Sequence, residues 1–168
     1  MAELPKYLRV GLFVSYISKP PFSTYLGDLD LNGDGTTSDL LPGARVNQFN
    51  RGLGKNDLRR LVNEFNRTYA GRQDAGGNHI PSITLPSTFE FGDSFLTHDL
   101  RLSREFPLRD RWRMTLMGEV FNVFNIGNLS GRSGDLLSPG FGQATSRVPQ
   151  VFGSGGPRAF QVAARLSF

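Results

Sequence analysis

The sequence lacks the features that most simply assign a chain to a class. It contains no cysteine, which excludes disulfide bonds and thiolate metal sites. It has no run of about 18 apolar residues, the length that a membrane-spanning helix requires. Its first sixteen residues show no basic segment followed by an apolar core and a cleavage site, so no signal peptide is predicted. These absences narrow the chemistry without assigning a fold.

Catalytic motifs are also missing. The sequence has no nucleophile elbow, phosphate-binding loop or dinucleotide fingerprint. The two histidines, His79 and His98, are isolated, and zinc needs several convergent ligands. A group formed by Asp99, Arg101, Arg113 and Glu119 could be read as an acid–base cluster. On adjacent strands, a charge ladder on a wet face is the simpler interpretation. We therefore expect that the chain is not an enzyme.

Positive charge is present but scattered. The chain carries 19 Lys and Arg against 15 Asp and Glu, a formal net charge of +4. It has no basic run and no aromatic-basic stripe of the kind that binds single-stranded nucleic acid. We therefore expect no nucleic-acid partner. The length of 168 residues is compatible with a single domain.

Four segments alternate between apolar and polar residues. The last one places five apolar residues on one face of an extended chain and polar or small residues on the other: Phe160, Val162, Ala164, Leu166 and Phe168 against Gln161, Ala163, Arg165 and Ser167. A period of two predicts strands. The strands are expected near 6–17, 94–107, 112–125 and 157–168. About ten alternating residues are enough for a tilted strand to cross a bilayer.

The connections between these strands differ in length. Pro107 to Arg111 is a short charged turn, whereas the segment 22–93 is too long for a connection inside a compact soluble domain. Within it, Leu58, Leu61, Val62, Phe65 and Tyr69 follow a helical period. This pattern predicts a helix near 56–69, with Asn56 as its N-cap and Gly71 as its stop. Asn125 to Pro157 forms a second, Gly-rich loop.

Aromatic residues gather at the two ends of the predicted strands. Antiparallel order places one group at the edge of the short turn and another at the opposite edge: Tyr7, Phe106, Trp112 and Phe168, then Tyr16, Phe124 and Phe160. His98 falls on the apolar side, near the second edge. Two aromatic girdles around an apolar band are typical of a barrel in a membrane. The predicted fold class is all-β, an antiparallel meander of about four long strands from the carboxyl-terminal part of a transmembrane β-barrel, with long outer loops and one short loop helix.

An Asp-rich run from Asp28 to Asp39 resembles the first half of a calcium loop. Its candidate ligands are Asp30, Asn32, Asp34, Thr36 and Asp39, with Gly35 at the sharp turn. Position twelve is Leu41, where a bidentate carboxylate is expected. The alternative is a solvated turn held by its own Asx side chains. Calcium in this loop would stabilise it without a catalytic role, and we expect no other cofactor.

An ordered series of motifs resembles the carboxyl-terminal end of TonB-dependent outer-membrane receptors. The closest similarity is to the Oar-like subfamily with a carboxypeptidase-regulatory-like amino-terminal domain. The motifs cover most of the chain: LNGDGTTSD at 31–39, IPSITLPSTFEFGDSF at 80–95, DLRLSREFPL at 99–108, GEVFNVFNIGN at 118–128, FGQATS at 141–146 and AARLSF at 163–168.

The resemblance implies a location and a set of partners. Such receptors are barrels of about 22 strands with an internal plug in the bacterial outer membrane. They take up siderophores, vitamins, peptides or sugars with energy from the TonB complex. The implied partners are outer-membrane lipid, the remaining strands and plug, and the barrel-assembly machinery, which would read the last strand, Phe160 to Phe168.

The sequence itself contains too little for the whole receptor. A barrel needs at least about eight strands, and only four are predicted here, without a plug or a TonB-contacting segment. We therefore expect the chain to be part of a longer protein and inactive alone. The alternative hypothesis is a soluble, calcium-stabilised all-β binding module, because the Asp-rich loop and the polar strand faces are also compatible with it.

Overall fold

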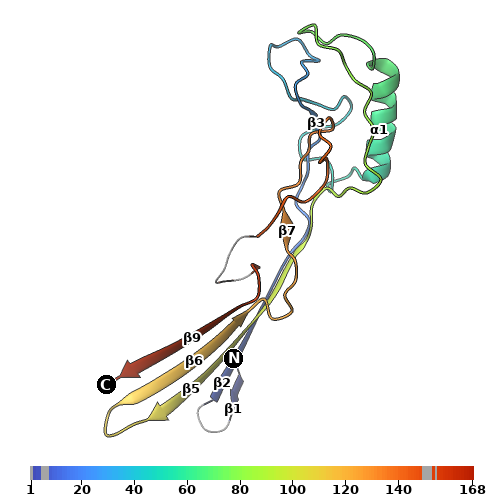
Figure 1. Cartoon of the computed structure of the whole chain (residues 1–168). Helices are drawn as coiled ribbons and strands as arrows, with labels where there is room; N and C mark the ends of the chain where they lie inside the picture. Colours follow the sequence, from blue (N-terminus) through green and yellow to red (C-terminus); the bar gives the residue numbers. More distant parts are fainter. Residues whose placement is uncertain (1, 5–7, 149–152, 154) are drawn as a thin grey trace. The chain divides into compact units, whose positions relative to one another are not determined.

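The structure is a computed structural model that describes residues 2–4, 8–148, 153 and 155–168 (Figure 1). It divides the chain into two compact units. The strand unit consists of Met1–Ser18, Ser94–Leu129 and Ser146–Phe168. The loop unit consists of Lys19–Asp93 and Ser130–Thr145. Each unit therefore combines segments that are distant in sequence, and each is described separately below.

The strand unit is one antiparallel sheet. Its strand order is β1 (Ala2–Leu4), β2 (Leu8–Ile17), β5 (Phe95–Pro107), β6 (Arg113–Phe121) and β9 (Ala159–Ser167). Figure 1 shows the four long strands side by side. The predicted meander of four long antiparallel strands is confirmed. The three-residue β1 was not predicted because it is too short to show a period.

The ends of the long strands differ from the predicted ones for local reasons. β6 stops at Phe121 because Asn122 (φ 48°) and Asn125 (φ 51°) adopt left-handed backbone conformations that a strand cannot contain. β9 begins at Ala159 and not at residue 157, since Pro157 has no N–H to donate to the neighbouring strand. Residues 6 and 7 of the predicted first strand, Tyr7 included, lie outside the described residues.

Connection lengths follow the predicted asymmetry. β5 and β6 are joined by a tight turn in which the Leu108 N–H donates to the Trp112 carbonyl at 2.9 Å. At the other end of the sheet, Ile17 pairs with Phe95, and Phe121 pairs with Ala159. Both long connections therefore leave the sheet at the same end, opposite the short turn.

Buried asparagines close the end of the sheet that carries the long connections. The Asn122 side chain donates to the carbonyls of Ile126 and Gly156, and the Asn128 side chain accepts from the Leu96 N–H at 2.9 Å and donates to the Gly155 carbonyl at 2.9 Å. Both side chains are buried. The repeated Asn residues of the GEVFNVFNIGN motif thus tie the chain after β6 to the chain before β9.

The loop unit has a conventional hydrophobic core. Its helix α1 (Lys55–Thr68) buries one apolar face, made of Leu58, Leu61, Val62 and Phe65. This face packs against an aromatic group from both segments of the unit that includes Phe22, Phe49, Phe89, Phe91 and Phe141. The predicted helix is confirmed within one residue at each end, and its apolar stripe contributes to a local core.

The predicted helix N-cap is wrong. Gly54 is the N-cap, and its backbone N–H donates to the Asp57 carboxylate at 2.9 Å. Asn56 lies inside the first turn, where its side chain accepts from Arg59 at 3.0 Å. The helix ends before Tyr69, and Gly71 (φ 81°) then takes the left-handed conformation that was expected of the stop residue.

Short strand pairs complete the fold. β3 (Tyr25–Leu26) pairs with β4 (Asp39–Leu40), and β7 (Leu129–Ser130) pairs with β8 (Ser146–Arg147). Among the described residues, the single long helix is too short and too polar to cross a membrane.

Candidate functional site

The register of the sheet gathers apolar side chains on one face. Two rows of directly paired residues cross all four long strands: Val10, Leu102, Gly118 and Val162 in one, and Leu12, Leu100, Val120 and Phe160 in the other. Met114 pairs with Leu166 in a further row. Side chains at paired positions share a face. The alternation read from each strand therefore becomes one continuous apolar surface.

This apolar face is open to its surroundings. Val162 is 84% exposed, Leu166 is 55% exposed and Leu116 is 40% exposed, while Leu100 and Met114 are half-buried. In the described part of the chain, these side chains are not sealed beneath a second layer. All five residues of the predicted membrane-facing set, Phe160, Val162, Ala164, Leu166 and Phe168, are exposed. A water-soluble protein rarely leaves so large an apolar surface uncovered.

Aromatic rings flank the apolar face at both ends. Next to the short turn, the rings of Trp112 and Phe168 lie 5.1 Å apart. At the other end, the rings of His98 and Phe124 meet edge to face at 5.0 Å. His98 pairs with Val14 on the apolar face, where the sequence places it. The arrangement is typical of side chains at the two interfaces of a membrane.

One charged residue on this face was missed in the sequence. Arg104 pairs with Leu8 on one side and with Leu116 on the other, in the middle of apolar positions. Its guanidinium lies 4.8 Å from the centre of the Phe106 ring. A long side chain near the end of a strand can bury its aliphatic stem and direct its charge to the interface. The break in alternation at position 104 was the available signal.

The opposite face of the sheet is polar and charged. Arg101 forms an ion pair with its cross-strand partner Glu119, and Arg113 contacts Glu105 at 3.4 Å. A groove of about 450 Å³ runs over this face and includes Arg9, Arg101, Arg113 and Arg165 in its lining. Of the predicted charge ladder, the Arg101–Glu119 pair is present, whereas Arg113 pairs with Glu105 and the Asp99 carboxylate accepts from the Asn122 N–H at 2.8 Å. Such a face suits water or another polar surface, and its ion pairs across strands help to fix the register.

The Asp-rich loop is organised by its own hydrogen bonds. The Asp30 carboxylate accepts from the backbone N–H groups of Gly33 (2.7 Å) and Gly35 (3.0 Å). Asp34 accepts from the backbone and the hydroxyl of Thr36, and its hydrogen bond with the Thr36 side chain lowers the pKa of its carboxyl. Asp39 accepts from the N–H groups of Leu31 and Asn32.

The predicted calcium ligands therefore lie in one loop, but the side-chain oxygens of Asp30, Asp34 and Asp39 already accept hydrogen bonds. In the described ranges, three or more acidic or histidine side chains do not converge as a metal site would require. The geometry resembles the Asx-rich turn that the sequence left open. Calcium binding by Asp30, Asn32, Asp34, Thr36 and Asp39 stays a prediction.

Comparison with known proteins gives one match. Residues 9–161 match a family model described as outer membrane beta barrel domain. The match begins in β2 and ends at the start of β9, so it covers β5, β6 and both long connections. No curated protein and no solved structure matches the chain.

Proposed function

Because this chain belongs to the outer membrane β-barrel domain family, we propose that it is the carboxyl-terminal barrel segment of a TonB-dependent receptor. In this proposal the four long strands form part of a barrel wall in the bacterial outer membrane. The receptor to which the segment belongs takes up a small ligand of the siderophore, sugar or peptide class. The family supports the membrane location, while the ordered motifs of the sequence support the receptor type.

The open apolar face is the observation that carries the barrel assignment. Val162, Leu116 and Leu102 lie on one continuous surface and are at least 40% exposed. Lipid stabilises such side chains without a second protein layer, whereas water does not. The polar face then lines the interior, where the Arg101–Glu119 pair stays wet. A soluble, calcium-stabilised module leaves this apolar surface without an explanation.

The connection lengths assign different roles to the strands and the loops of the proposed receptor. Both long connections leave one end of the sheet, and they build the loop unit. Long loops of outer-membrane barrels face the exterior, so the loop unit takes part in ligand capture. Translocation needs the plug and the remaining strands, so the segment alone transports nothing and performs no catalysis. Its other proposed partners are outer-membrane lipid and the barrel-assembly machinery, which would recognise β9.

Solubility tests the barrel assignment. The full chain, expressed without added sequences, should enter inclusion bodies and refold only in detergent micelles. Circular dichroism and size-exclusion chromatography in plain buffer and in detergent measure this dependence. A monodisperse chain that unfolds cooperatively in plain buffer would contradict a lipid-facing wall and favour the soluble module.

The upstream coding sequence tests the receptor assignment separately. It should encode a signal peptide, a plug and roughly eighteen further strands, the number that completes a large transporter barrel. Deletion of the complete gene should then abolish TonB-dependent growth on one class of scarce nutrient. A short upstream frame that encodes only a few strands would retain the family and overturn the receptor.

A further inference from the structure

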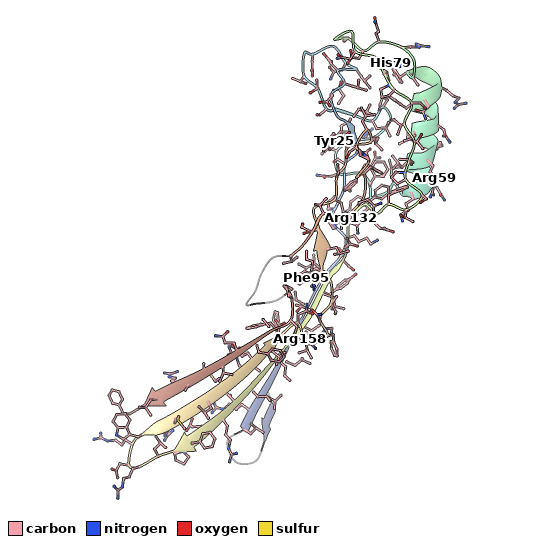
Figure 2. All side chains as sticks on the ribbon, viewed as in Figure 1. Tyr25, Arg59, His79, Phe95, Arg132 and Arg158 are labelled. Atoms are coloured by element: carbon pink, nitrogen blue, oxygen red, sulfur yellow. The ribbon has the colours of Figure 1, made fainter. Side chains whose placement is uncertain are left out.

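A pocket of about 340 Å³ lies within the loop unit. One side of it is formed by the start of α1, with Lys55 and Arg59, and another by the segment from Ser87 to Glu90. Arg132, Gly142 and Gln143 from the second long connection complete the lining. Figure 2 labels Arg59 on the helix and Arg132 in the segment after β7. The pocket thus depends on both connections.

Two of these cations are held in place by an aromatic ring. The Lys55 ammonium lies 5.5 Å from the centre of the Phe89 ring, and the Arg59 guanidinium lies 5.7 Å from it. Phe89 is itself fixed in the core, where its ring contacts Phe141 at 5.5 Å. Attraction to the ring therefore restrains both charges at the pocket before any ligand arrives.

The charges at this site do not balance. Lys19 and Lys55 share the Glu90 carboxylate, and Arg132 is paired with Asp93 at 2.6 Å. In the ion pairs of the described residues, Arg59 has no carboxylate partner, and its guanidinium donates only to the neutral Asn56 side chain. The pocket lining itself holds three cations, Lys55, Arg59 and Arg132, and one carboxylate, Glu90. Including Lys19 and Asp93, which pair with lining residues from outside the lining, leaves the same excess of two positive charges.

Glu90 remains charged under ordinary conditions. The hydrogen bond from the Lys55 side chain, more than any other contact, lowers the pKa of its carboxyl. The excess positive charge therefore remains when the Glu90 carboxylate is ionised. The hydroxyl-bearing residues Ser87 and Thr88 add neutral polar groups to the same pocket.

From this geometry we propose that the pocket binds an anionic group, a phosphate or carboxylate, with Arg59 and Lys55 as its principal contacts. Guanidinium and ammonium groups donate charge-assisted hydrogen bonds to such anions. The anion can be a free solute or the headgroup of a lipid. The inference does not depend on TonB coupling, since it concerns residues of the loop unit alone.

Calorimetry with inorganic phosphate tests the site on the full chain refolded in an uncharged detergent. Saturable binding is expected, and Arg59→Gln should weaken it about tenfold, the loss of one charge-assisted hydrogen bond. Arg59→Lys should keep part of the affinity. The matched control is Arg60→Gln, which removes the same charge from the same helix outside the pocket lining and should change the affinity less than about twofold.

Glu90→Gln provides a test that misfolding cannot imitate. It removes a negative charge at the pocket, so phosphate should bind several-fold more tightly. Absence of phosphate binding, or equal losses in Arg59→Gln and Arg60→Gln, would overturn the site. The proposed receptor function would survive that result, because the solubility and gene tests do not involve this pocket.

Lipid vesicles distinguish the two sources of the anion. The chain is reconstituted in phosphatidylcholine with or without phosphatidylglycerol, and hydrogen exchange is followed at α1. Slower exchange with phosphatidylglycerol that is lost in Arg59→Gln would identify a lipid headgroup. Phosphate binding in micelles without such a lipid effect would identify a free anion. Both results support the site.

Discussion

The two units of this molecule treat apolar side chains in opposite ways. In the described residues, all fourteen buried hydrophobic side chains belong to the loop unit, Phe49 and Phe141 among them. Of the sixteen large hydrophobic side chains that are exposed, only Val46 belongs to it. The strand unit carries the others, and its described residues include no buried hydrophobic side chain. One chain therefore combines a unit with the buried core of a water-soluble domain and a unit whose apolar side chains face outward.

The contrast shows that periodicity and burial are separate properties. Each long strand alternates as a strand of a soluble sandwich would. In a sandwich, a second sheet about 10 Å away covers the apolar face, whereas here the face stays open. What covers the apolar face, and not the alternation along the strand, distinguishes a soluble sandwich from a membrane barrel. A substitution confined to one unit can therefore be measured with the other unit as the reference.

The largest effect is expected in the core of the loop unit. Phe141→Ala removes a fully buried ring that packs on Phe22 and Phe89, so it should destabilise this unit by about 3–5 kcal/mol. The matched change, Phe160→Ala, removes a ring that is 68% exposed on the sheet. Hydrogen exchange in detergent should show faster opening confined to the loop unit for the first variant. Equal effects in both units would contradict the placement of the hydrophobic core in the loop unit.

A charge on the apolar face should have the next largest effect. Val162→Arg places a guanidinium where we propose lipid, at a cost of about 2–4 kcal/mol near the middle of a bilayer. Gln161→Arg changes the preceding residue of β9, which points to the polar face, and should leave the stability almost unchanged. Urea unfolding in lipid vesicles, followed by Trp112 fluorescence, measures both. Tolerance of Val162→Arg together with damage from Gln161→Arg would reverse the assigned faces.

Loss of a buried polar anchor should weaken only the loop-side end of the sheet. Asn122→Ala leaves the Ile126 N–H and the Gly156 carbonyl without their partner, at a cost of about 1–3 kcal/mol. The exposed Asn125→Ala serves as a control, although its side chain also accepts from the Arg158 N–H at 3.3 Å. Exchange should accelerate at Leu96 and around Gly155 in the first variant. An unchanged rate there would remove Asn122 from this role.

Acid should loosen the loop unit before the strand unit. The pKa of Asp74 is lowered from its usual value of 3.8, chiefly by the Asn78 side chain, and that of Glu90 is lowered from 4.5. A lowered folded-state pKa contributes stability that is complete above the unfolded value and is lost as the pH falls through the folded value. Hydrogen exchange from pH 6 down to about pH 3 should therefore reveal opening around Glu90 first, as the pH falls below 4.5, and then around Asp74 below 3.8. Asp74→Asn should reduce this pH dependence.

Calcium should have the smallest effect of all. The carboxylates of Asp30 and Asp39 already accept backbone N–H groups, so an ion would have to replace these bonds. We expect calcium to change exchange in the segment 30–39 only slightly. Strong protection there at micromolar calcium, lost in Asp30→Asn, would establish the calcium interpretation of this loop.

Regular alternation made the sheet predictable from the sequence. The period of two located β2, β5, β6 and β9, because each side chain reports its face without information from other strands. The helix was equally visible from its period. Its N-cap was missed, since Gly54 has no side chain to signal a cap. The capping hydrogen bond is instead accepted by the Asp57 carboxylate, three residues later, from the Gly54 N–H.

The pocket could not be predicted because its parts meet through tertiary structure. The Glu90 N–H donates to the Gly142 carbonyl across 52 residues, at 3.1 Å, and no local pattern in the sequence indicates this pairing. Gly142 itself (φ 66°) is required there, since a side chain would collide with Phe89. Arg104 was missed for a different reason: a single charge among apolar positions interrupts the period without revealing where its head group goes.

The union of the two long connections in one core also limits how such a protein can diversify. The backbone N–H of Tyr25 donates to the Gly134 carbonyl, and the Tyr25 carbonyl accepts from the Leu136 N–H. These bonds tie the segment 130–145 to the first connection. Transplanting the first connection alone into a related barrel would leave out Leu136 and Phe141, two buried residues of this core. Recombination, in nature or in the laboratory, must therefore exchange both connections as a pair to keep this core intact.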